Sequence, residues 1–135
     1  MLCMSTAGYS GTPLLQKLGV KDGMSVYVDG GPPHTGELLS GSTYTTRLPR
    51  SIDLALLFTT SLARLEKRLP VVLERTVANG MVWVCWPKKA SKVPTDVDEN
   101  KIRDHALALG VVDVKVAAID ATWSGLKLVR RLKDR

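Results

Sequence analysis

The sequence predicts a three-layer, Rossmann-like α/β domain with a mostly parallel sheet and a C-terminal antiparallel β-hairpin. Short apolar runs rich in β-branched and aromatic residues are typical of buried strands, and they alternate here with amphipathic segments typical of helices. The last two runs follow one another without a helix between them, which indicates a hairpin. The 135 residues are one domain's length and contain no internal repeat and no linker that would divide them, so we expect a single domain over residues 1–135.

The expected elements can be placed along the chain from their apolar periodicity and from the residues that flank them. The expected strands are residues 24–28, 43–48 (an edge strand), 52–58, 81–86, 112–118 and 126–132. The expected helices are residues 13–18, 35–39, 62–78 and 96–109. The first twelve residues are small, polar and rich in glycine, so we expect a flexible loop there.

The most apolar run, MVWVCW at residues 81–86, is expected to be the central strand. Asn79 and Gly80 precede this run and are expected to terminate the helix before it. Pro87 follows the run and is expected to end the strand, because a proline cannot donate to the hydrogen-bond ladder of a sheet. Cys85 lies inside the run, and we expect it to be a small buried hydrophobic residue.

Helix boundaries follow from capping residues. Thr12 is expected to cap the first helix, with proline at its first position. The polar residues 59–61 offer caps for the third helix, and Thr95 or Asp96 offers one for the fourth. Pro70 lies within the third helical pattern, where a proline costs ~3 kcal/mol, so we expect a kink or a restart there.

Composition limits the classes of function. The formal net charge is +6, and the whole excess lies after residue 60, which permits an anionic partner but is equally typical of a solvated basic face. No run approaches the ~18 apolar residues of a membrane span, and the N-terminus lacks the pattern of a signal peptide. Two cysteines are too few for a disulfide framework and suit a reducing compartment. We therefore expect a cytoplasmic protein that does not contact membranes.

A candidate site lies where the carboxyl ends of the parallel strands meet, since ligands of open α/β sheets bind outside that edge. The residues expected to gather there are Gly30, Gly31, Lys88, Lys89, Ser91, Lys92, Asp120, Trp123 and Ser124. Lysines, hydroxyl groups and one aromatic ring suit a phosphate-bearing or otherwise anionic ligand, or a protein partner. The alternative is that the lysines are solvated, that Trp123 packs beneath its loop, and that Gly30 and Gly31 form a plain turn.

Other chemistry has weak support in the sequence. There is no HxxxH, CxxC or GxSxG motif, so we assign no catalytic residue and no metal ligand. His34 lies beside two prolines and His105 lies on a polar helix position, and neither is expected to have a catalytic role. The acidic residues 96–104 are typical of a helix start, where carboxylates are favoured by the helix dipole.

Three sequence blocks carry a resemblance to known proteins. The blocks AGYSGTPL at residues 7–14, WVCWPKKAS at residues 83–91 and DATWSGLK at residues 120–127 resemble an uncharacterised family of small bacterial proteins, a domain of unknown function. That family has no assigned reaction, so the resemblance implies a fold but no activity.

The order of elements also resembles the C-terminal half of class I methyltransferases, which use S-adenosylmethionine. The sequence departs from that pattern in two places. The GxGxG loop that would hold the cofactor is replaced by Gly30-Gly31-Pro32-Pro33, and each proline removes a backbone N–H. Too few residues lie between this loop and Ile52 for the βα units that carry the acidic ribose ligand. The resemblance implies a trimmed nucleoside half, and we expect no cofactor, with S-adenosylmethionine as the alternative.

Three hypotheses follow. The first is a non-catalytic or regulatory binding protein with an anionic-ligand or partner site at the carboxyl edge of the sheet. The alternative is a minimal S-adenosylmethionine-dependent methyltransferase. The third is a nucleic-acid-binding protein that uses the basic second part of the chain. A homodimer formed through the edge of the last hairpin is compatible with each of them.

Overall fold

The computed structural model describes residues 13–134. The loop expected over residues 1–12 and the cap expected at Thr12 lie outside the described residues. Within them, the strands are β2 (Val26–Asp29), β3 (Ile52–Phe58), β4 (Thr76–Pro87), β5 (Val111–Ala118) and β6 (Trp123–Arg130). The helices are α1 (Leu14–Leu18), α2 (Thr35–Leu38), α3 (Leu62–Arg75) and α4 (Glu99–Ala108), and two short 3-10 turns are η1 (Lys89–Ser91) and η2 (Leu132–Asp134).

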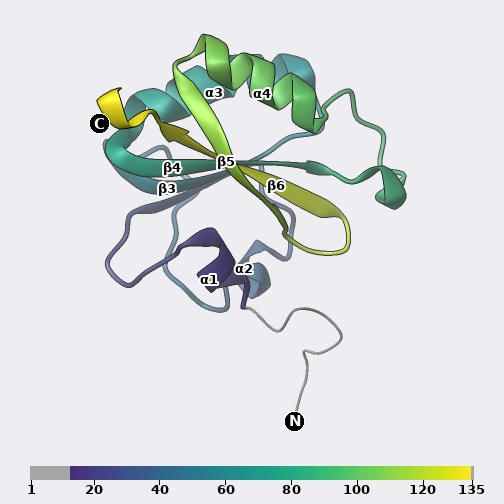
Figure 1. Cartoon of the computed structure of the whole chain (residues 1–135). Helices are drawn as coiled ribbons and strands as arrows, with labels where there is room; N and C mark the ends of the chain where they lie inside the picture. The colour runs from purple at the N-terminus through teal and green to yellow at the C-terminus, as the bar shows by residue number, and fades with distance from the viewer. Residues whose placement is uncertain (1–12, 135) are drawn as a thin grey trace.

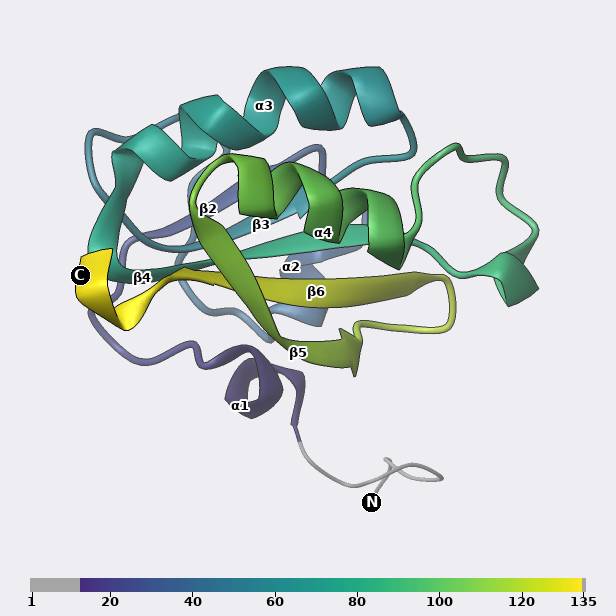
Figure 2. The same cartoon turned by 45° about the horizontal axis from the view of Figure 1, so that its top comes forward.

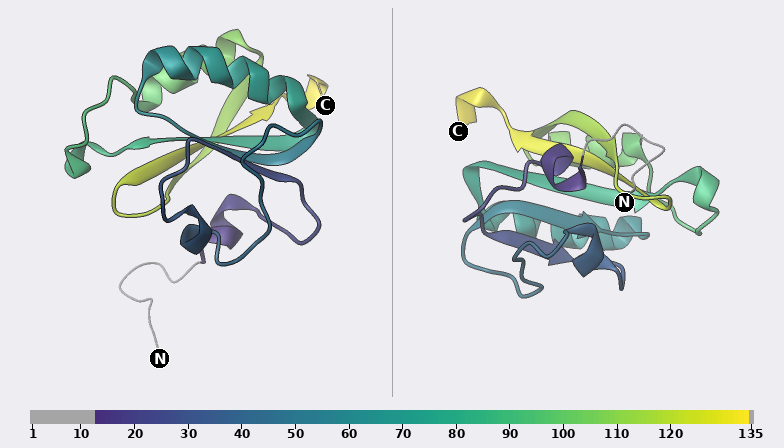
Figure 3. Two further views of the ribbon diagram at one scale, coloured as in Figure 1. Left: turned by 180° about the vertical axis from the view of Figure 1, so that it is seen from behind. Right: turned by 90° about the horizontal axis from the view of Figure 1, so that it is seen from below.

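The described strands form one sheet in the order β2-β3-β4-β6-β5, with helices on both faces. Helices α3 and α4 cover one face, while α1 and α2 lie on the other (Figure 1, Figure 3). This three-layer architecture confirms the predicted α/β class. No described helix is both long enough and apolar enough to cross a membrane.

The expectation of a mostly parallel sheet is only partly right. In the described sheet β2–β3 and β3–β4 pair in parallel, whereas β6 pairs antiparallel with both β4 and β5. The crossover through α4 leaves one strand position empty next to β4 and places β5 at the position after it. Strand β6 then runs back and fills the position between β4 and β5 (Figure 2). The final hairpin is therefore inserted into the sheet, and half of the strand pairings become antiparallel.

The central strand has core on both of its faces, as its unbroken apolar run predicts. Val82, Val84 and Trp86 pack in the core beneath α3 and α4, whereas Trp83 and Cys85 pack in the core beneath α1 and α2. The indole of Trp83 is fully buried, and its Nε1 donates a hydrogen bond to the carbonyl of Leu18 at 3.0 Å. This bond satisfies the polar atom of the largest buried side chain and anchors α1 to the sheet.

Helix α3 ends earlier than the sequence suggests. It stops at Arg75, and β4 begins at the next residue, so Asn79 and Gly80 lie inside the strand instead of at the end of the helix. The register between β3 and β4 shifts in this segment, and a Cβ atom on Gly80 would lie 2.9 Å from the carbonyl oxygen of Asp53. Gly80 is thus required by close strand packing at an irregularity.

The junction between α3 and β4 is closed by a residue far along the chain. Arg130, at the end of β6, donates hydrogen bonds to the carbonyl oxygens of Leu73, Thr76 and Val77. Leu73 lies in the last turn of α3, where its carbonyl also accepts from the backbone N–H of Thr76. A side chain from the last strand therefore caps a helix from the middle of the chain.

A restart at Pro70 and the predicted cap of α4 are not found. Helix α3 continues through Pro70, because its buried residues Leu65, Leu69 and Val72 hold it on the sheet. Helix α4 is capped by Asp98, whose carboxylate accepts from the backbone N–H of Lys101. The residues expected to cap α4, Thr95 and Asp96, instead hydrogen-bond to the turn and first residue of α3.

The edge strand expected over residues 43–48 is reduced to a single bridge. Thr45 lies beside β2 in parallel orientation, accepting from Val28 N–H and donating to the carbonyl of Val26, both at 2.9 Å. The chain thus passes outside β2 at Thr45 and then returns to the other side of β2 to form β3. The order of segments reverses between β2 and β3, which makes this the topological switch point of the sheet.

Candidate functional site

The carboxyl ends of β2 and β3 border the place where an open α/β sheet usually binds its ligand. Asp29 ends β2 and Phe58 ends β3, and we call the space between these two ends the β2–β3 crevice. A pocket of about 330 Å³ adjoins it, at the lower limit of typical ligand sites. The pocket is lined by Val28, Asp29, Gly30, Gly31, Pro32, Pro33, Thr35, Tyr44 and Thr46.

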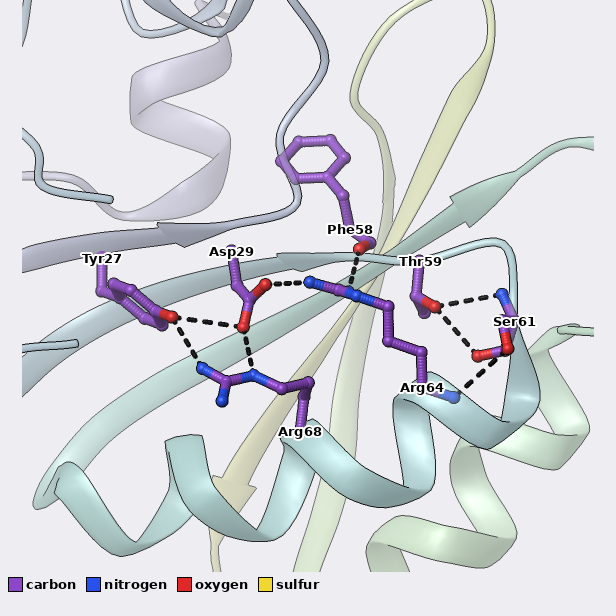
Figure 4. Close-up of polar contacts among 7 residues, drawn as sticks. All are labelled: Tyr27, Asp29, Phe58, Thr59, Ser61, Arg64 and Arg68. Carbon is purple, nitrogen blue, oxygen red and sulfur yellow. Dashed lines mark hydrogen bonds and ion pairs between the residues drawn. The ribbon is translucent and has the colours of Figure 1, made fainter. Parts of the chain in front are cut away.

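Two arginines from α3 reach across the β2–β3 crevice to Asp29. Arg64 donates to one carboxylate oxygen of Asp29 and, at 2.7 Å, to the carbonyl oxygen of Phe58 (Figure 4). Arg68 donates through Nε to the other oxygen of Asp29 at 2.6 Å, and its Nη2 donates to the hydroxyl of Tyr27 at 2.9 Å. The Asp29 side chain is only 8% exposed, so both of its oxygens are paired in a nearly buried position.

The electrostatics of this cluster favour one charge state. The hydrogen bond to Asp29 is the largest cause that raises the pKa of Arg68. Burial, followed by the negative charge of Asp29, raises the pKa of Tyr27. Both shifts favour a cationic Arg68 and a neutral Tyr27 near neutral pH. By formal charge, two arginines and one aspartate give the cluster one net positive charge.

Local structure explains how α3 delivers both arginines to the crevice. The side chain of Ser61 caps the helix by accepting from the backbone N–H of Arg64, and Thr59 fixes the turn before it through two hydrogen bonds to Ser61 (Figure 4). Arg64 and Arg68 are four residues apart and so lie on the same helix face. The capped start of the helix sets that face toward the carboxyl end of β2.

Close packing inside the protein explains why the loop after β2 has glycine at positions 30 and 31. Gly30 has φ +67°, and a Cβ atom there would lie 2.7 Å from the carbonyl oxygen of Phe58 and against the Arg64 guanidinium. A Cβ atom on Gly31 would overlap the side chain of Thr35 and lie 2.8 Å from a methyl group of Val28. Their absence of side chains brings the loop close to β3 and to α2, and so shapes the wall of the pocket.

A second contact joins distant segments at the same end of the sheet. The Nε2 atom of His34 lies 2.7 Å from Oδ2 of Asp120, and the other carboxylate oxygen, Oδ1, accepts from the backbone N–H groups of Thr122 and Trp123. Burial raises the pKa of Asp120, but the hydrogen bonds from His34 and the two amides outweigh burial and leave it lowered. The sequence assigned His34 no catalytic role and did not predict this contact, because its partner lies 86 residues away.

Trp123 supports this connection through packing. Its ring meets the ring of Phe58 edge to face, with centroids 5.1 Å apart. Phe58 thus accepts a hydrogen bond from Arg64 through its carbonyl oxygen and packs through its ring against Trp123, the first residue of β6. Trp123 and Ser124 both belong to β6 in the structure, although the sequence suggested that they precede the strand.

The lysines predicted for the site occupy a separate region. We call residues 88–92 the lysine segment; it includes η1 and projects beyond the end of the sheet, at the far right of Figure 1 and Figure 2. Lys89 and Lys92 are exposed, whereas the Ser91 hydroxyl donates to the carbonyl of Lys88. The backbone N–H of Lys88 donates to Thr122 at 2.8 Å, which ties the start of the segment to the β5–β6 turn. None of these lysines lines the pocket beside Gly30 and Gly31.

Other reactive groups have structural roles in the described part of the chain. Cys85 is fully buried, as predicted, and burial raises the pKa of its thiol, which disfavours the nucleophilic thiolate. No group of three or more histidine, cysteine, aspartate or glutamate residues within residues 13–134 is placed to hold a metal ion.

The arginine cluster was missed by the sequence analysis. The spacing of Arg64 and Arg68 is visible in the sequence, but it reads equally well as the solvated face of an amphipathic helix. Their partner Asp29 lies 35 and 39 residues away. A position at the end of the first buried strand was the one signal that could have singled out Asp29.

Comparison with solved structures identifies the fold. The chain is similar to a magnesium protoporphyrin IX methyltransferase from Synechocystis PCC 6803 with bound SAM, with 12% identity, a TM-score of 0.59, and coverage of 87% of this chain and 74% of that one. It is also similar to a SAM-dependent methyltransferase from Aquifex aeolicus, with 11% identity, a TM-score of 0.56, and coverage of 85% and 86%. The described chain therefore has a methyltransferase-like α/β fold.

Sequence comparisons add no closer relationship. No protein-family model matches the sequence, and no curated protein matches it. The resemblance to an uncharacterised bacterial family therefore stays a prediction, while the predicted likeness to class I methyltransferases is supported by the fold.

Proposed function

We propose that this protein binds S-adenosylmethionine or S-adenosylhomocysteine in the pocket beside the β2–β3 crevice and acts as a small methyltransferase. The observation that carries the proposal is the position of the pocket, which lies at the carboxyl end of β2, between the glycine loop and the segment around Thr45 that runs along the outer edge of β2. Solved structures of similar fold hold SAM or SAH. This proposal replaces our expectation of a protein without a cofactor.

The residues of the pocket fit such a ligand by type. Tyr44 offers an aromatic face for a purine, and Thr35 and Thr46 carry hydroxyl groups suited to a ribose. Asp29 also lines the pocket, but both of its carboxylate oxygens are paired with Arg64 and Arg68. When bound, the cofactor would supply a methyl group on a sulfonium centre, and the protein's contribution is to hold it at the open edge of the sheet.

Calorimetric titration of the full chain with S-adenosylhomocysteine and S-adenosylmethionine tests this proposal. We expect saturable 1:1 binding at submillimolar concentration, and weaker binding in Tyr44→Ala because the aromatic face is lost. Lys89→Ala, a substitution on the lysine segment, serves as the control and should bind like the wild type. Absence of saturable binding at millimolar ligand would overturn the proposal.

A second candidate is a non-catalytic protein that binds an anionic small molecule or an acidic partner. The net positive charge of the arginine cluster favours it, together with the exposed lysines of the lysine segment. Titration with inorganic phosphate and nucleotides tests the small-molecule form. This candidate requires anion binding that is lost in Lys88→Ala/Lys89→Ala, whereas the methyltransferase proposal requires binding that this double variant retains.

Nucleic-acid binding remains a third proposal with a distinct signature. If the basic part of the chain contacts phosphates, the logarithm of the affinity for short RNA must fall steeply with the logarithm of salt concentration. A flat dependence would exclude this role.

A further inference from the structure

We propose that the sheet surface formed by β5 and β6 on the side of α1 binds an acidic peptide segment of a partner protein. We call this surface the β5–β6 face. Its residues are Val112 and Lys115 from β5, Lys127 and Val129 from β6, and Lys17 from α1. None of them lines the pocket at the carboxyl end of β2, so the inference does not depend on the proposed function.

The strand register places two lysines directly opposite each other on this face. Lys127 pairs with Trp83 of β4 on one side and with Lys115 of β5 on the other. Directly paired residues of antiparallel strands project to the same side of the sheet, and Trp83 packs in the core beneath α1 and α2. Lys115 agrees with this orientation, because its Nζ donates to the carbonyl of Lys17 in α1 at 3.3 Å.

A β-bulge turns Lys115 toward α1. The pairing of β5 with β6 shifts between Asp113 and Lys115. Asp113 projects to the other side of the sheet, where it pairs with Arg103 of α4 at 3.0 Å. In a regular strand Lys115 would project to the same side as Asp113, two residues earlier, but the extra residue of the bulge reverses the alternation. The irregularity therefore brings Lys115 beside Lys127.

The lysine pair has no counter-charge in the described structure. Like charges directly opposite each other in an antiparallel pair are destabilising. Among residues 13–134, no aspartate or glutamate forms an ion pair with Lys17, Lys115 or Lys127. An acidic group placed between the two strand lysines would relieve their repulsion, so the β5–β6 face is complementary to a negatively charged partner.

Apolar neighbours of the lysines favour a peptide over a nucleic acid. Val112 and Val129 pair directly on the same face, and both are half-buried, so a strip of apolar surface borders the lysine pair. A phosphate backbone gains little from apolar surface, and the residues of the face include no aromatic ring on which a base could stack. A peptide with both acidic and apolar side chains matches the lysines and the valines together.

Fluorescence anisotropy of labelled synthetic peptides with the full chain tests this proposal. The first peptide contains glutamate with leucine at every fourth position, and the second has serine in place of leucine. We expect saturable binding of the first peptide and severalfold weaker binding of the second, because contact with the valines is lost. Lys115→Gln/Lys127→Gln should bind the first peptide at least about tenfold more weakly than the wild type.

Lys67→Gln/Lys101→Gln is the matched control. These exposed lysines lie on α3 and α4, on the other side of the sheet, and their substitution removes the same net charge. Salt screens charges at that distance, so this variant should bind the first peptide within about twofold of the wild type. An equal loss in both double variants would overturn the proposal, because attraction by the overall charge predicts that result.

Lys127→Glu separates recognition from folding. The substitution replaces a like-charge pair with an opposite-charge pair across the two strands, so its melting temperature should equal or exceed that of the wild type. Its binding of the glutamate–leucine peptide should nevertheless be lost. A clearly lower melting temperature, or undiminished peptide binding, would overturn the role assigned to the lysine pair.

Short RNA distinguishes the other class of acidic partner. We expect RNA to bind more weakly than the glutamate–leucine peptide at the same ionic strength. Tighter binding of RNA that requires Lys115 and Lys127 would overturn the peptide proposal and assign the face to nucleic acid. Absence of saturable binding of the first peptide to the wild type would also overturn it.

Discussion

At the carboxyl edge of the sheet, the β2–β3 crevice and the lysine segment both concentrate cationic side chains, but in opposite surroundings. In the crevice, Arg64 and Arg68 share one carboxylate that is 8% exposed. On the lysine segment, Lys89 and Lys92 are exposed. The difference teaches that a run of charges in a sequence does not reveal which charges the fold holds in fixed, paired positions.

The largest contrast should come from removing the shared carboxylate. Asp29→Ala leaves two guanidinium groups without their anion and the Tyr27 hydroxyl without an acceptor, so we expect a loss of about 3 kcal/mol in the free energy of unfolding. Urea denaturation measures this loss. Asp104→Ala, at an exposed position on α4, is the control and should change stability by no more than ~0.5 kcal/mol. If Asp29→Ala and Asp104→Ala lowered the free energy of unfolding by similar amounts, a paired, nearly buried carboxylate would contribute no more to stability than an exposed one.

The next effect concerns the wall of the crevice. Gly30→Ala combines a positive φ with a clash against the Phe58 carbonyl, and we expect a cost of about 2–3 kcal/mol. Gly23→Ala has a similar φ of +85° and no atom within 4 Å of its Cβ position, so it should cost about 1 kcal/mol. Thermal or urea unfolding of both variants isolates the cost of crowding. If Gly30→Ala and Gly23→Ala cost the same free energy of unfolding, the close contact between Gly30 and the Phe58 carbonyl would have no effect on stability.

The contact between His34 and Asp120 should produce a pH-dependent effect of intermediate size. The pKa of Asp120 is lowered in the folded state, so its ionised form stabilises the fold above the ordinary pKa near 3.8, and this stability is lost as the pH falls through the folded-state pKa. Asp120→Asn should cost on the order of 1 kcal/mol near neutral pH.

Unfolding experiments on Asp120→Asn at several pH values check this sign. The difference between the wild type and the variant should shrink at pH values below the ordinary pKa of Asp120. A difference that is constant from pH 7 to strongly acidic pH would contradict the assignment. His34→Gln, which removes one of the three contacts to Asp120, should have a smaller effect.

The smallest effect is expected on the lysine segment. Lys89→Ala removes an exposed charge and should change the free energy of unfolding by less than ~0.5 kcal/mol. A loss of stability comparable to that of Asp29→Ala would contradict the exposed position of Lys89 and indicate that its side chain is packed in solution.

Local patterns in the sequence predicted much of the fold. The strand at Ile52–Phe58, the short helix near Thr35 and the cap at Ser61 were all predicted, because apolar periodicity and capping chemistry act over a few residues. The predicted start of β4 and the predicted cap of α4 were wrong, and a tertiary contact explains each difference. Gly80 lies within β4 because of the register with β3. Thr95 and Asp96 do not cap α4 because they hydrogen-bond to the start of α3.

The candidate site was harder to predict for the same reason. Gly30, Gly31 and Asp120 were correctly expected at the carboxyl edge, because the direction of parallel strands fixes where their loops lie. The arginine cluster depends on which face of α3 meets the end of β2. That pairing joins residues 35 and 39 positions apart, and no local pattern encodes it.

The capping of the α3–β4 junction by Arg130 has a consequence for the order in which the domain can fold. The ribosome makes the end of α3 and the first residues of β4 more than fifty residues before Arg130, since the contacts span 53 to 57 positions. Until β6 is made and inserted beside β4, the carbonyls of Leu73, Thr76 and Val77 lack the contacts with Arg130, although Leu73 still accepts from the backbone N–H of Thr76. Contacts that span so many residues slow the closing of the native structure.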